Sequence, residues 1–387
     1  MKIAAFNVEN LFDRAKAFNE DSPADAQRAI RAVAELNSIF EEENYTQPRK
    51  RRILELVEIL ELNRFNEGPL ALIRKIRGAI IKRPRAGGIE VVADGRGEWI
   101  GWAELKTAPV DEIAILNTGR VIRDVDADIL AVVEAEDRVS LKKFTKFVFD
   151  QVNNELPAAE RPDPYECVML IDGNDDRGID VGLMTKANFD IGPMRSHIHD
   201  VQPNGNLVYS RDCPEYSVTT PAGELIWLLP NHFKSKFGGN NAASIAKREA
   251  QANRTAEIYQ RLRDTGNDNV VVLGDLNDTP DSDPLQPLLA ATDLQDVSDH
   301  QNFEVGEFNV PANNTNAGIG TFGLGNDNNK IDYLLLSPAL FNRVTAAGLF
   351  RKGAWPGSRP QRWEVYEELT EKIHVASDHH VIWVEIN

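Results

Sequence analysis

Short runs of apolar residues, each ended by polar or turn-forming residues, recur along the chain and predict β-strands. The expected strands lie at residues 2–6, 128–134, 165–172, 178–186, 224–233, 270–273, 330–337 and 381–387. Between several of these runs the apolar residues are spaced three and four apart, which predicts helices, most clearly at 245–263. With 387 residues and 42% hydrophobic content, the chain can fold as one large two-layer domain or as two ordinary ones.

The segment between the first and second predicted strands is unusually long. Its apolar spacing predicts two helices between residues 24 and 62 and a third at 70–80, while the runs 89–92 and 99–105 predict a small β-hairpin. Because these elements separate the first strand from the next core strand, residues 41–112 are interpreted as an insertion.

Residues 270–278, VVVLGDLND, hold the first candidates for chemistry. The apolar run predicts a buried strand that Gly274 ends, so Asp275 and Asn277 fall where the strand opens into a loop. Side chains two apart on an extended segment face the same way, so this carboxylate and amide can converge on one ligand. A phosphate with its attacking water fits the pair. A surface turn is the alternative, because Asp, Asn and Gly are ordinary turn residues.

Polar side chains also stand at the ends of other predicted strands. The full set is Asn7, Glu134, His232, Asp275 with Asn277, Asp332, and Asp378 with His379. One such residue alone is typical of a turn. Six strand ends with the same feature favour a shared site, because strand ends are where open sheets present chemistry.

The composition and the apolar windows bear on the location of the protein in the cell. No window reaches the length of apolar sequence that a transmembrane helix needs, and the first residues turn polar by position 7, so neither a membrane span nor a signal peptide is expected. A cytoplasmic location is the default expectation. Cys167 and Cys213 are too few for a disulfide framework and have no zinc-site spacing. The oligomeric state is left open.

Charge is distributed unevenly. The net charge of -17 argues against a general binder of polyanions, but residues 49–96 carry 12 Lys or Arg against 6 Asp or Glu, which leaves the remainder near -23. This basic segment is interpreted either as a binding site for a phosphate backbone or as the solvated surface of amphipathic helices. Trp99 and Trp102 nearby could stack on bases. The candidate substrate-binding residues are Arg49, Lys50, Arg51, Arg52, Lys75 and Arg77.

Two formal motif matches are rejected. The run that begins at Asp275 resembles a calcium loop, but Pro280 stands where an EF-hand needs glycine and Gln286 where it needs a bidentate glutamate. Residues 318–323, GIGTFG, match a dinucleotide fingerprint, but no apolar strand precedes them and no helix follows.

Six motifs occur in a telling order: FNVENLF, DILAVVE, NHFKSK, GDLND, KIDYLLLS and SDHHVI. Through them the chain resembles the endonuclease/exonuclease/phosphatase superfamily, the metal-dependent fold of DNase I, apurinic endonucleases, neutral sphingomyelinases and inositol polyphosphate 5-phosphatases. The resemblance runs from residue 2 to 387 and skips the insertion. It implies one domain, 1–387, of α/β (α+β) class: a DNase I-like two-layer β-sandwich of mixed sheets flanked by helices, with the helical and hairpin insertion after the first strand.

The resemblance also implies roles for the strand-end residues around the attacking water. Asp275 and Asn277 resemble the pair that orients and activates it. His379 resembles the histidine that contacts the scissile phosphate, and Asp332 the carboxylate that fixes its tautomer. His232 is similar to a second phosphate-facing histidine.

Further implied roles concern the cation and the phosphate. Glu134 resembles the metal-binding glutamate, Asn7 the amide that supports the metal or its water, and Asp378 a further metal ligand. Glutamine commonly precedes the superfamily's glutamate, whereas Val133 does so here, and Glu136 could serve instead. Arg177 is a loose match to a phosphate-facing arginine, and His380 is interpreted as structural. The donor types favour Mg²⁺, with Mn²⁺ or Ca²⁺ as alternatives.

Three functions are compatible with these residues. The basic insertion favours a metal-dependent nuclease that cleaves DNA or RNA phosphodiesters by in-line attack of an activated water. The acidic remainder favours a phosphatase or phosphodiesterase acting on small or lipid-headgroup phosphoesters. A catalytically silent scaffold that binds nucleic acid or protein is the third. The expected partner is therefore a phosphoester substrate.

Overall fold

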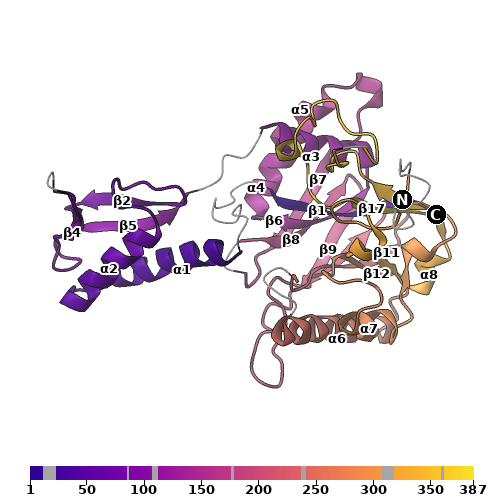
Figure 1. Cartoon of the computed structure of the whole chain (residues 1–387). Coiled ribbons are helices and arrows are strands. Elements are labelled where there is room, and N and C mark those ends of the chain that lie inside the picture. The colour runs from indigo at the N-terminus through magenta and orange to yellow at the C-terminus, as the bar shows by residue number, and fades with distance from the viewer. Residues whose placement is uncertain are drawn as a thin grey trace. The chain divides into compact units, whose positions relative to one another are not determined.

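The computed structural model describes residues 1–11, 23–84, 87–106, 112–175, 178–236, 241–306, 318–358 and 361–387. The chain folds as two compact units (Figure 1). The large unit comprises Met1–Phe12 and Val110–Asn387, and the small unit comprises Asp13–Pro109. Among the described residues no helix combines the length and the apolar character required to cross a bilayer.

Two mixed β-sheets form the large unit. The first has seven strands, in the order β14 (Phe303–Glu304), β16 (Val344–Phe350), β17 (Val381–Ile386), β1 (Lys2–Leu11), β6 (Ile129–Ala135), β8 (Asp180–Lys186) and β7 (Tyr165–Ile171). The second has six, in the order β13 (Gln295–Asp296), β15 (Asp332–Leu336), β12 (Val270–Asp275), β11 (Leu225–His232), β10 (Glu215–Thr219) and β9 (Asp190–Arg195). Both contain parallel pairs, β1 with β6 and β11 with β12, among antiparallel ones. The strands predicted from the apolar runs are confirmed.

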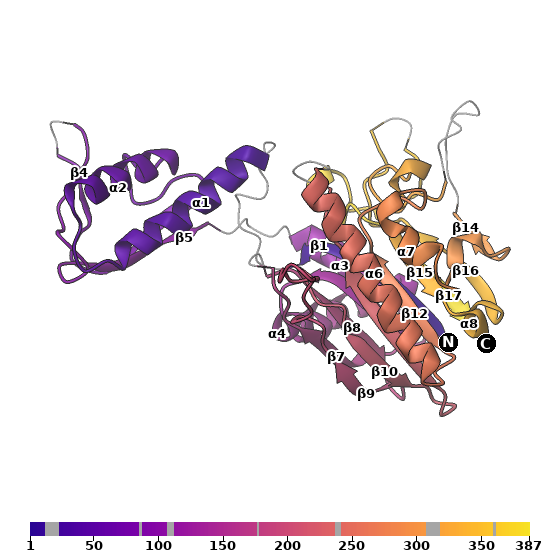
Figure 2. The same ribbon diagram turned by 90° about the horizontal axis from the view of Figure 1, so that it is seen from below.

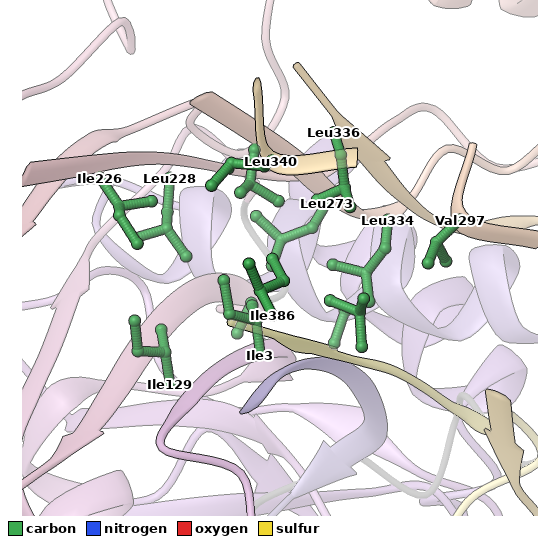
Figure 3. Close-up of a cluster of buried hydrophobic side chains, with 14 of the residues drawn as sticks. Ile3, Ile129, Ile226, Leu228, Leu273, Val297, Leu334, Leu336, Leu340 and Ile386 are labelled. Carbon is green, nitrogen blue, oxygen red and sulfur yellow. The ribbon is translucent and has the colours of Figure 1, made fainter. Parts of the chain in front are cut away.

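The core of the large unit lies between the two sheets. Apolar side chains that alternate along the strands meet there, Ile3 and Ile129 from one sheet against Leu228, Leu273 and Leu334 from the other (Figure 3). All five are at most 1% exposed. Because successive strand residues point to opposite faces, each sheet also has an apolar outer face that needs covering.

Helices cover both outer faces (Figures 1 and 2). On the seven-stranded sheet lie α3 (Glu112–Val125), α4 (Arg138–Lys143) and α5 (Asp150–Asn153), with a π-helical turn at Phe144–Phe149. On the six-stranded sheet lie α6 (Ala242–Asp264) and α7 (Gln286–Leu289), while α8 (Pro338–Phe341) follows β15. This is the two-layer sandwich of mixed sheets flanked by helices that the sequence resemblance implied, so that expectation is confirmed.

The small unit has a core of its own. Helices α1 (Pro23–Phe40) and α2 (Gln47–Ile59) pack with two short sheets around the buried ring of Trp99. One sheet pairs β2 (Ala71–Arg77) with β5 (Ile100–Leu105), and the other pairs β3 (Ile81–Lys82) with β4 (Glu90–Val91). The compact unit includes α1, ahead of the predicted insertion start at residue 41, and ends at Pro109.

Two secondary-structure predictions in this segment are wrong. The expected third helix at 70–80 is the strand β2, because its apolar spacing of three and four is overridden by pairing with β5. Ile76, which was expected on the buried face of that helix, is 69% exposed. The expected hairpin of 89–92 with 99–105 does not form, since those runs pair with β3 and β2 respectively.

Candidate active site

Three adjacent strands of the six-stranded sheet bring ionisable side chains to one edge. His232 at the end of β11 lies opposite Asp275 at the end of β12, and Asp275 lies opposite Asp332 at the start of β15. Residues directly opposite one another on paired strands present their side chains on the same face. All three are at most 3% exposed.

The seven-stranded sheet supplies the other half of the site. Asn7 lies on β1, Glu134 on β6, and His379 two residues before β17. The side-chain amide of Asn7 joins the two halves, since Nδ2 donates to Asp275 Oδ2 at 3.2 Å and lies 3.4 Å from His379 Nε2. The predicted residues of the two sheets therefore meet in one cluster.

His379 and Asp332 form a buried dyad. His379 Nδ1 lies 2.9 Å from Asp332 Oδ2, while Nε2 lies 3.9 Å from Asp275 Oδ2 and 3.7 Å from Asp378 Oδ1. Burial by itself lowers the pKa of His379, but the charges of Asp332, Asp275 and Asp378 and the hydrogen bond to Asp332 outweigh it and hold that pKa well above the usual 6.5. The cationic form of the imidazole is therefore favoured, with Nδ1 directed at Asp332 and Nε2 facing Asp275 and Asp378.

Asp275 is the hub of the cluster. Its carboxylate accepts the backbone N–H of Asn277 at 2.8 Å and the side-chain NH₂ of Asn277 at 3.0 Å, in addition to Asn7. Burial, followed by the negative charge of Asp332, raises the pKa of Asp275 to about 8, although His379 and the Asn277 amide oppose the rise. A carboxyl with this pKa exchanges its proton close to neutral pH, as a general base must.

Glu134 and His232 lie on the other side of Asp275. His232 Nε2 is 3.6 Å from Glu134 Oε1 and 3.7 Å from Asp275 Oδ2, so the two carboxylates flank one ring nitrogen. Glu134 is directed there by an irregularity in β6, where its φ is 67° and the pairing with β8 shifts by one residue. Asn277, with φ of 55°, is held in the same left-handed region. Strained backbone of this kind is characteristic of functional sites.

Two supporting residues were not predicted from the sequence. Ser377 Oγ donates to Asn7 O at 2.7 Å and accepts the N–H of His379 at 2.9 Å. Glu9 Oε2 accepts the N–H of Asp378 at 3.0 Å. Both stand beside predicted site residues in the chain, Ser377 in SDHH and Glu9 in FNVENLF, and this adjacency was the available signal.

The sequence itself matches a known family. The model of the Endonuclease/Exonuclease/phosphatase family aligns with residues 103–352, which is more than half of the chain and includes Glu134, His232, Asp275, Asn277 and Asp332. The chain belongs to the endonuclease/exonuclease/phosphatase family. Members of this family hydrolyse phosphoester bonds, so the chain is a phosphoester hydrolase and the predicted enzyme class is confirmed.

Solved structures of low sequence identity are similar to the chain. A mannosyl-6-phosphatase of Bacteroides thetaiotaomicron VPI-5482 has 15% identity and a TM-score of 0.47, covering 71% of this chain and 90% of its own. Truncated TDP2 of Caenorhabditis elegans has 13% identity and a TM-score of 0.42, covering 70% and 88%. The human Nocturnin catalytic domain, with a bound sulfate anion, has 13% identity and a TM-score of 0.47, covering 71% and 87%. No curated protein matches the sequence.

The family depends on a divalent cation, and the donors of the site suit one. Asp275, Asp332 and His379 each place a ligand atom within 4.8 Å of the others, but the imidazole of His379 already stands between the two acidic side chains and is bonded to Asp332. The carboxylates of Glu134 and Asp378 border the cluster and are 17% and 37% exposed. Oxygen donors that solvent can reach are what a hard divalent cation requires. Asn7 Oδ1 is engaged by the N–H of Glu9 at 3.0 Å.

The remaining candidates are Arg177 and the basic residues of the small unit. Arg177 falls outside the described residues. In the small unit, Arg49 pairs with Glu42, Lys50 with Asp94, and Arg52 with both Glu35 and Glu55. Arg51 and Lys75 are exposed, and Arg77, also exposed, donates to Gly97 O at 3.1 Å.

The two tryptophans of the small unit differ in exposure. Trp99 is 1% exposed, and its indole N–H donates to Tyr45 OH at 3.0 Å. The expectation that it stacks on bases is therefore wrong, because its ring belongs to the core of the small unit. Trp102, on β5, is 43% exposed, so its ring is not enclosed by the core and the stacking prediction stays open for it.

Proposed function

We propose that the chain hydrolyses phosphodiester bonds in nucleic acid, by attack of an activated water in a reaction that requires Mg²⁺ or a similar divalent cation. The observation that carries the proposal is the buried row Asp332, His379 and Asp275, in which the imidazole of His379 stands between two acidic side chains. A cationic donor suits the negative oxygens of a phosphate, and a buried carboxyl with a pKa near neutrality suits the water that attacks it.

The residues divide the work as follows. His379 Nε2 donates its proton to a nonbridging phosphate oxygen, while Asp332 holds the opposite ring nitrogen at 2.9 Å and so fixes the ring. Asp275 accepts the proton of the water, and Asn277 holds its carboxylate in place through two hydrogen bonds. His232, between Glu134 and Asp275, faces the phosphate from the other side.

Glu134 and Asp378 would hold the cation, with Asn7 beside them. The cation would neutralise charge on the phosphate and stabilise the leaving oxygen. Glu134 is directed into the site by its strained φ, and Asp378 by the hydrogen bond from its backbone N–H to Glu9. The chain itself therefore sets the backbone position of each of these two ligands.

A polymeric substrate is supported by the charge of the small unit. Its 17 Lys or Arg against 16 Asp or Glu give a net charge of +1, whereas the large unit carries -18. Arg51, Lys75 and Arg77 on its surface have no carboxylate partner among the described residues, which leaves them available to phosphates. The acidic large unit favours the second candidate, a phosphatase or phosphodiesterase acting on small or lipid-headgroup phosphoesters.

One assay separates the two candidates. The full chain is incubated with supercoiled plasmid, a single-stranded oligonucleotide and a small chromogenic phosphodiester, each with Mg²⁺, Mn²⁺, Ca²⁺ or chelator. The proposal expects cation-dependent cleavage of nucleic acid that weakens steeply as salt rises. Hydrolysis of the small ester alone would replace the nuclease with the second candidate.

A further inference from the structure

Residues 318–323, the glycine-rich GIGTFG segment rejected as a dinucleotide motif, lie against the His379–Asp332 dyad. Phe322 forms a β-bridge with His379, the N–H of Gly323 donates to Asp378 O at 2.8 Å, and the N–H of His380 donates to Thr321 O at 2.7 Å. The segment, called the strap below, thus runs antiparallel to residues 378–380 along their whole length.

Thr321 fixes the backbone on the carboxylate side of the dyad. Its side-chain oxygen accepts two backbone N–H groups, that of Ile331 at 3.0 Å and that of Asp332 at 2.9 Å. Thr321 is 0% exposed, so this oxygen, and not solvent, satisfies the two N–H groups. Asp332 is the first residue of β15, and the residue before it, Ile331, accepts the backbone N–H of Leu276 at 2.9 Å. The N–H groups of Ile331 and Asp332 both go to the threonine oxygen, which therefore helps to set the position from which the Asp332 carboxylate reaches His379.

Phe322 supports the imidazole side of the dyad. Its ring centroid lies 5.0 Å from that of His379, with an interplanar angle of 61°, an edge contact that limits rotation of the imidazole. The same two adjacent strap residues therefore touch both members of the dyad, one through a hydroxyl and the other through a ring.

The strap is itself held by further contacts. His380 Nδ1 accepts from Arg351 Nε at 3.2 Å, which leaves Nε2 to donate to Gly323 O at 3.2 Å. A Cβ on Gly320 would stand 2.0 Å from Asn326 O, so the strap can pass only where that residue is glycine. Close packing thus explains Gly320, and a φ of 59° explains Gly323.

We propose that Thr321 and Phe322 are positioning residues, which hold Asp332 and His379 in the hydrogen-bonded geometry that the reaction uses. Neither residue is assigned contact with the reacting atoms. The inference rests on the proposed function only for its kinetic consequences, because the geometry of the dyad can be observed without turnover.

The test compares T321V with T321S in the full chain. Valine has the shape of threonine without the oxygen, so the N–H groups of Ile331 and Asp332 lose their acceptor, whereas serine keeps it. T321V is expected to lower kcat by about 10-fold to 100-fold with KM changed less than about twofold, and T321S to stay within about threefold of the parent. T185V serves as the matched control, because Thr185 is also 0% exposed and hydrogen-bonded to backbone, at Phe189 O, away from the dyad.

A spectroscopic measurement is made in parallel on the cation-free chain. The Nδ1–H of His379 bonded to Asp332 should give a proton resonance far downfield of the amide signals, assigned by its loss in H379A. T321V is expected to broaden or remove this resonance, while T321S and T185V retain it. Should T321V fail to fold, F322L replaces it, with the resonance broadened and kcat lowered about threefold to 10-fold.

The outcomes separate the two proposals. A T321V chain that keeps the resonance and falls no further in kcat than T185V overturns the positioning role. A parent chain that shows the resonance but hydrolyses no phosphoester overturns the proposed function. In that case the positioning role is still supported if T321V loses the resonance while T321S and T185V keep it.

Discussion

The large and small units place their charged side chains in opposite surroundings. Asp275, Asp332 and His379 of the large unit are at most 8% exposed and share partners. Arg49 and Arg52 of the small unit have ion-pair distances as short as 2.7 to 2.8 Å, but their side chains are 49% and 39% exposed. Exposed ion pairs contribute little to protein stability because water competes for both ions. A buried ion that loses its partner, in contrast, strongly destabilises the fold. Charge count therefore says less about function than burial does.

If burial decides which charged side chains matter for function, removal of His379 should lower activity more than any other substitution proposed for this protein. H379A takes away the cationic donor and leaves Asp332 and Asp275 adjacent without it. We expect kcat to fall by about 10²-fold or more. Activity is measured on the substrate that the assay under Proposed function identifies, and the folded fraction of each variant is checked by circular dichroism.

H199A is the matched control for this substitution. His199 is exposed and lies outside the cluster, so its loss should leave kcat unchanged. Equal activity of H379A and H199A would remove His379 from the reaction and with it the central row of the proposed site.

The strained backbone at Glu134 provides the second comparison, within the large unit. Glu134 borders the cluster on a φ of 67°, and Glu136, the alternative open from the sequence, follows the end of β6. E134Q keeps the size of the side chain but removes its charge. We expect the Mg²⁺ concentration for half-maximal activity to rise about 10-fold to 100-fold in E134Q and to change less than about threefold in E136Q. The reverse order would transfer the metal-binding role to Glu136.

Burial of Asp275 also predicts how stability depends on pH. The folded chain holds the proton of Asp275 up to about pH 8, but the unfolded chain releases it near the ordinary pKa of 3.8. Since the folded state binds more protons between these values, the free energy of unfolding should fall as pH rises from about 4 to about 8. Asp180, whose pKa burial raises to about 7, acts in the same direction.

Substitution with asparagine isolates the contribution of Asp275. D275N keeps a neutral side chain and removes the titration, so the decline of stability with pH should become shallower. The measurement is urea unfolding of the cation-free large unit within the full chain, at several values between about pH 5 and pH 8. D180N should remove a separate part of the decline. Parallel pH profiles for D275N and the parent would show that Asp275 is ionised in the folded state.

The strands of the large unit could be predicted because their apolar runs are local and short. Part of the site could be predicted in the same way, because His232, Asp275 and Asp332 stand directly at the ends of such apolar runs, on neighbouring strands. The partnership of Asp332 with His379 came from the family resemblance, because 47 residues separate them and only the fold brings them together. Spacing carries no information about such a distant contact.

The small unit shows where sequence reasoning ended. The apolar residues of 70–80 fit a helical period, and only the pairing of β2 with β5 makes them a strand. From the sequence Trp99 is a candidate for stacking on bases, but its indole is enclosed by the core and bonded to Tyr45. The charge count over residues 49–96 leaves out Glu42 and Glu35, which pair with Arg49 and Arg52 from outside that segment. In each case the deciding contact is non-local.

The smallest expected effect tests the small unit itself. Arg49 and Arg52 are already neutralised by carboxylates, whereas Lys75 and Arg77 have no carboxylate partner among the described residues. If the unit contacts a nucleic-acid backbone, K75Q/R77Q should reduce the slope of log activity against log salt by about 1 to 2, while R49Q/R52Q should leave it nearly unchanged. Both double variants remove two positive charges, so net charge alone predicts equal changes. Equal slopes in both would mean that ion pairing on the surface does not select the contacting residues, and an unchanged slope in both would assign substrate binding to the large unit alone.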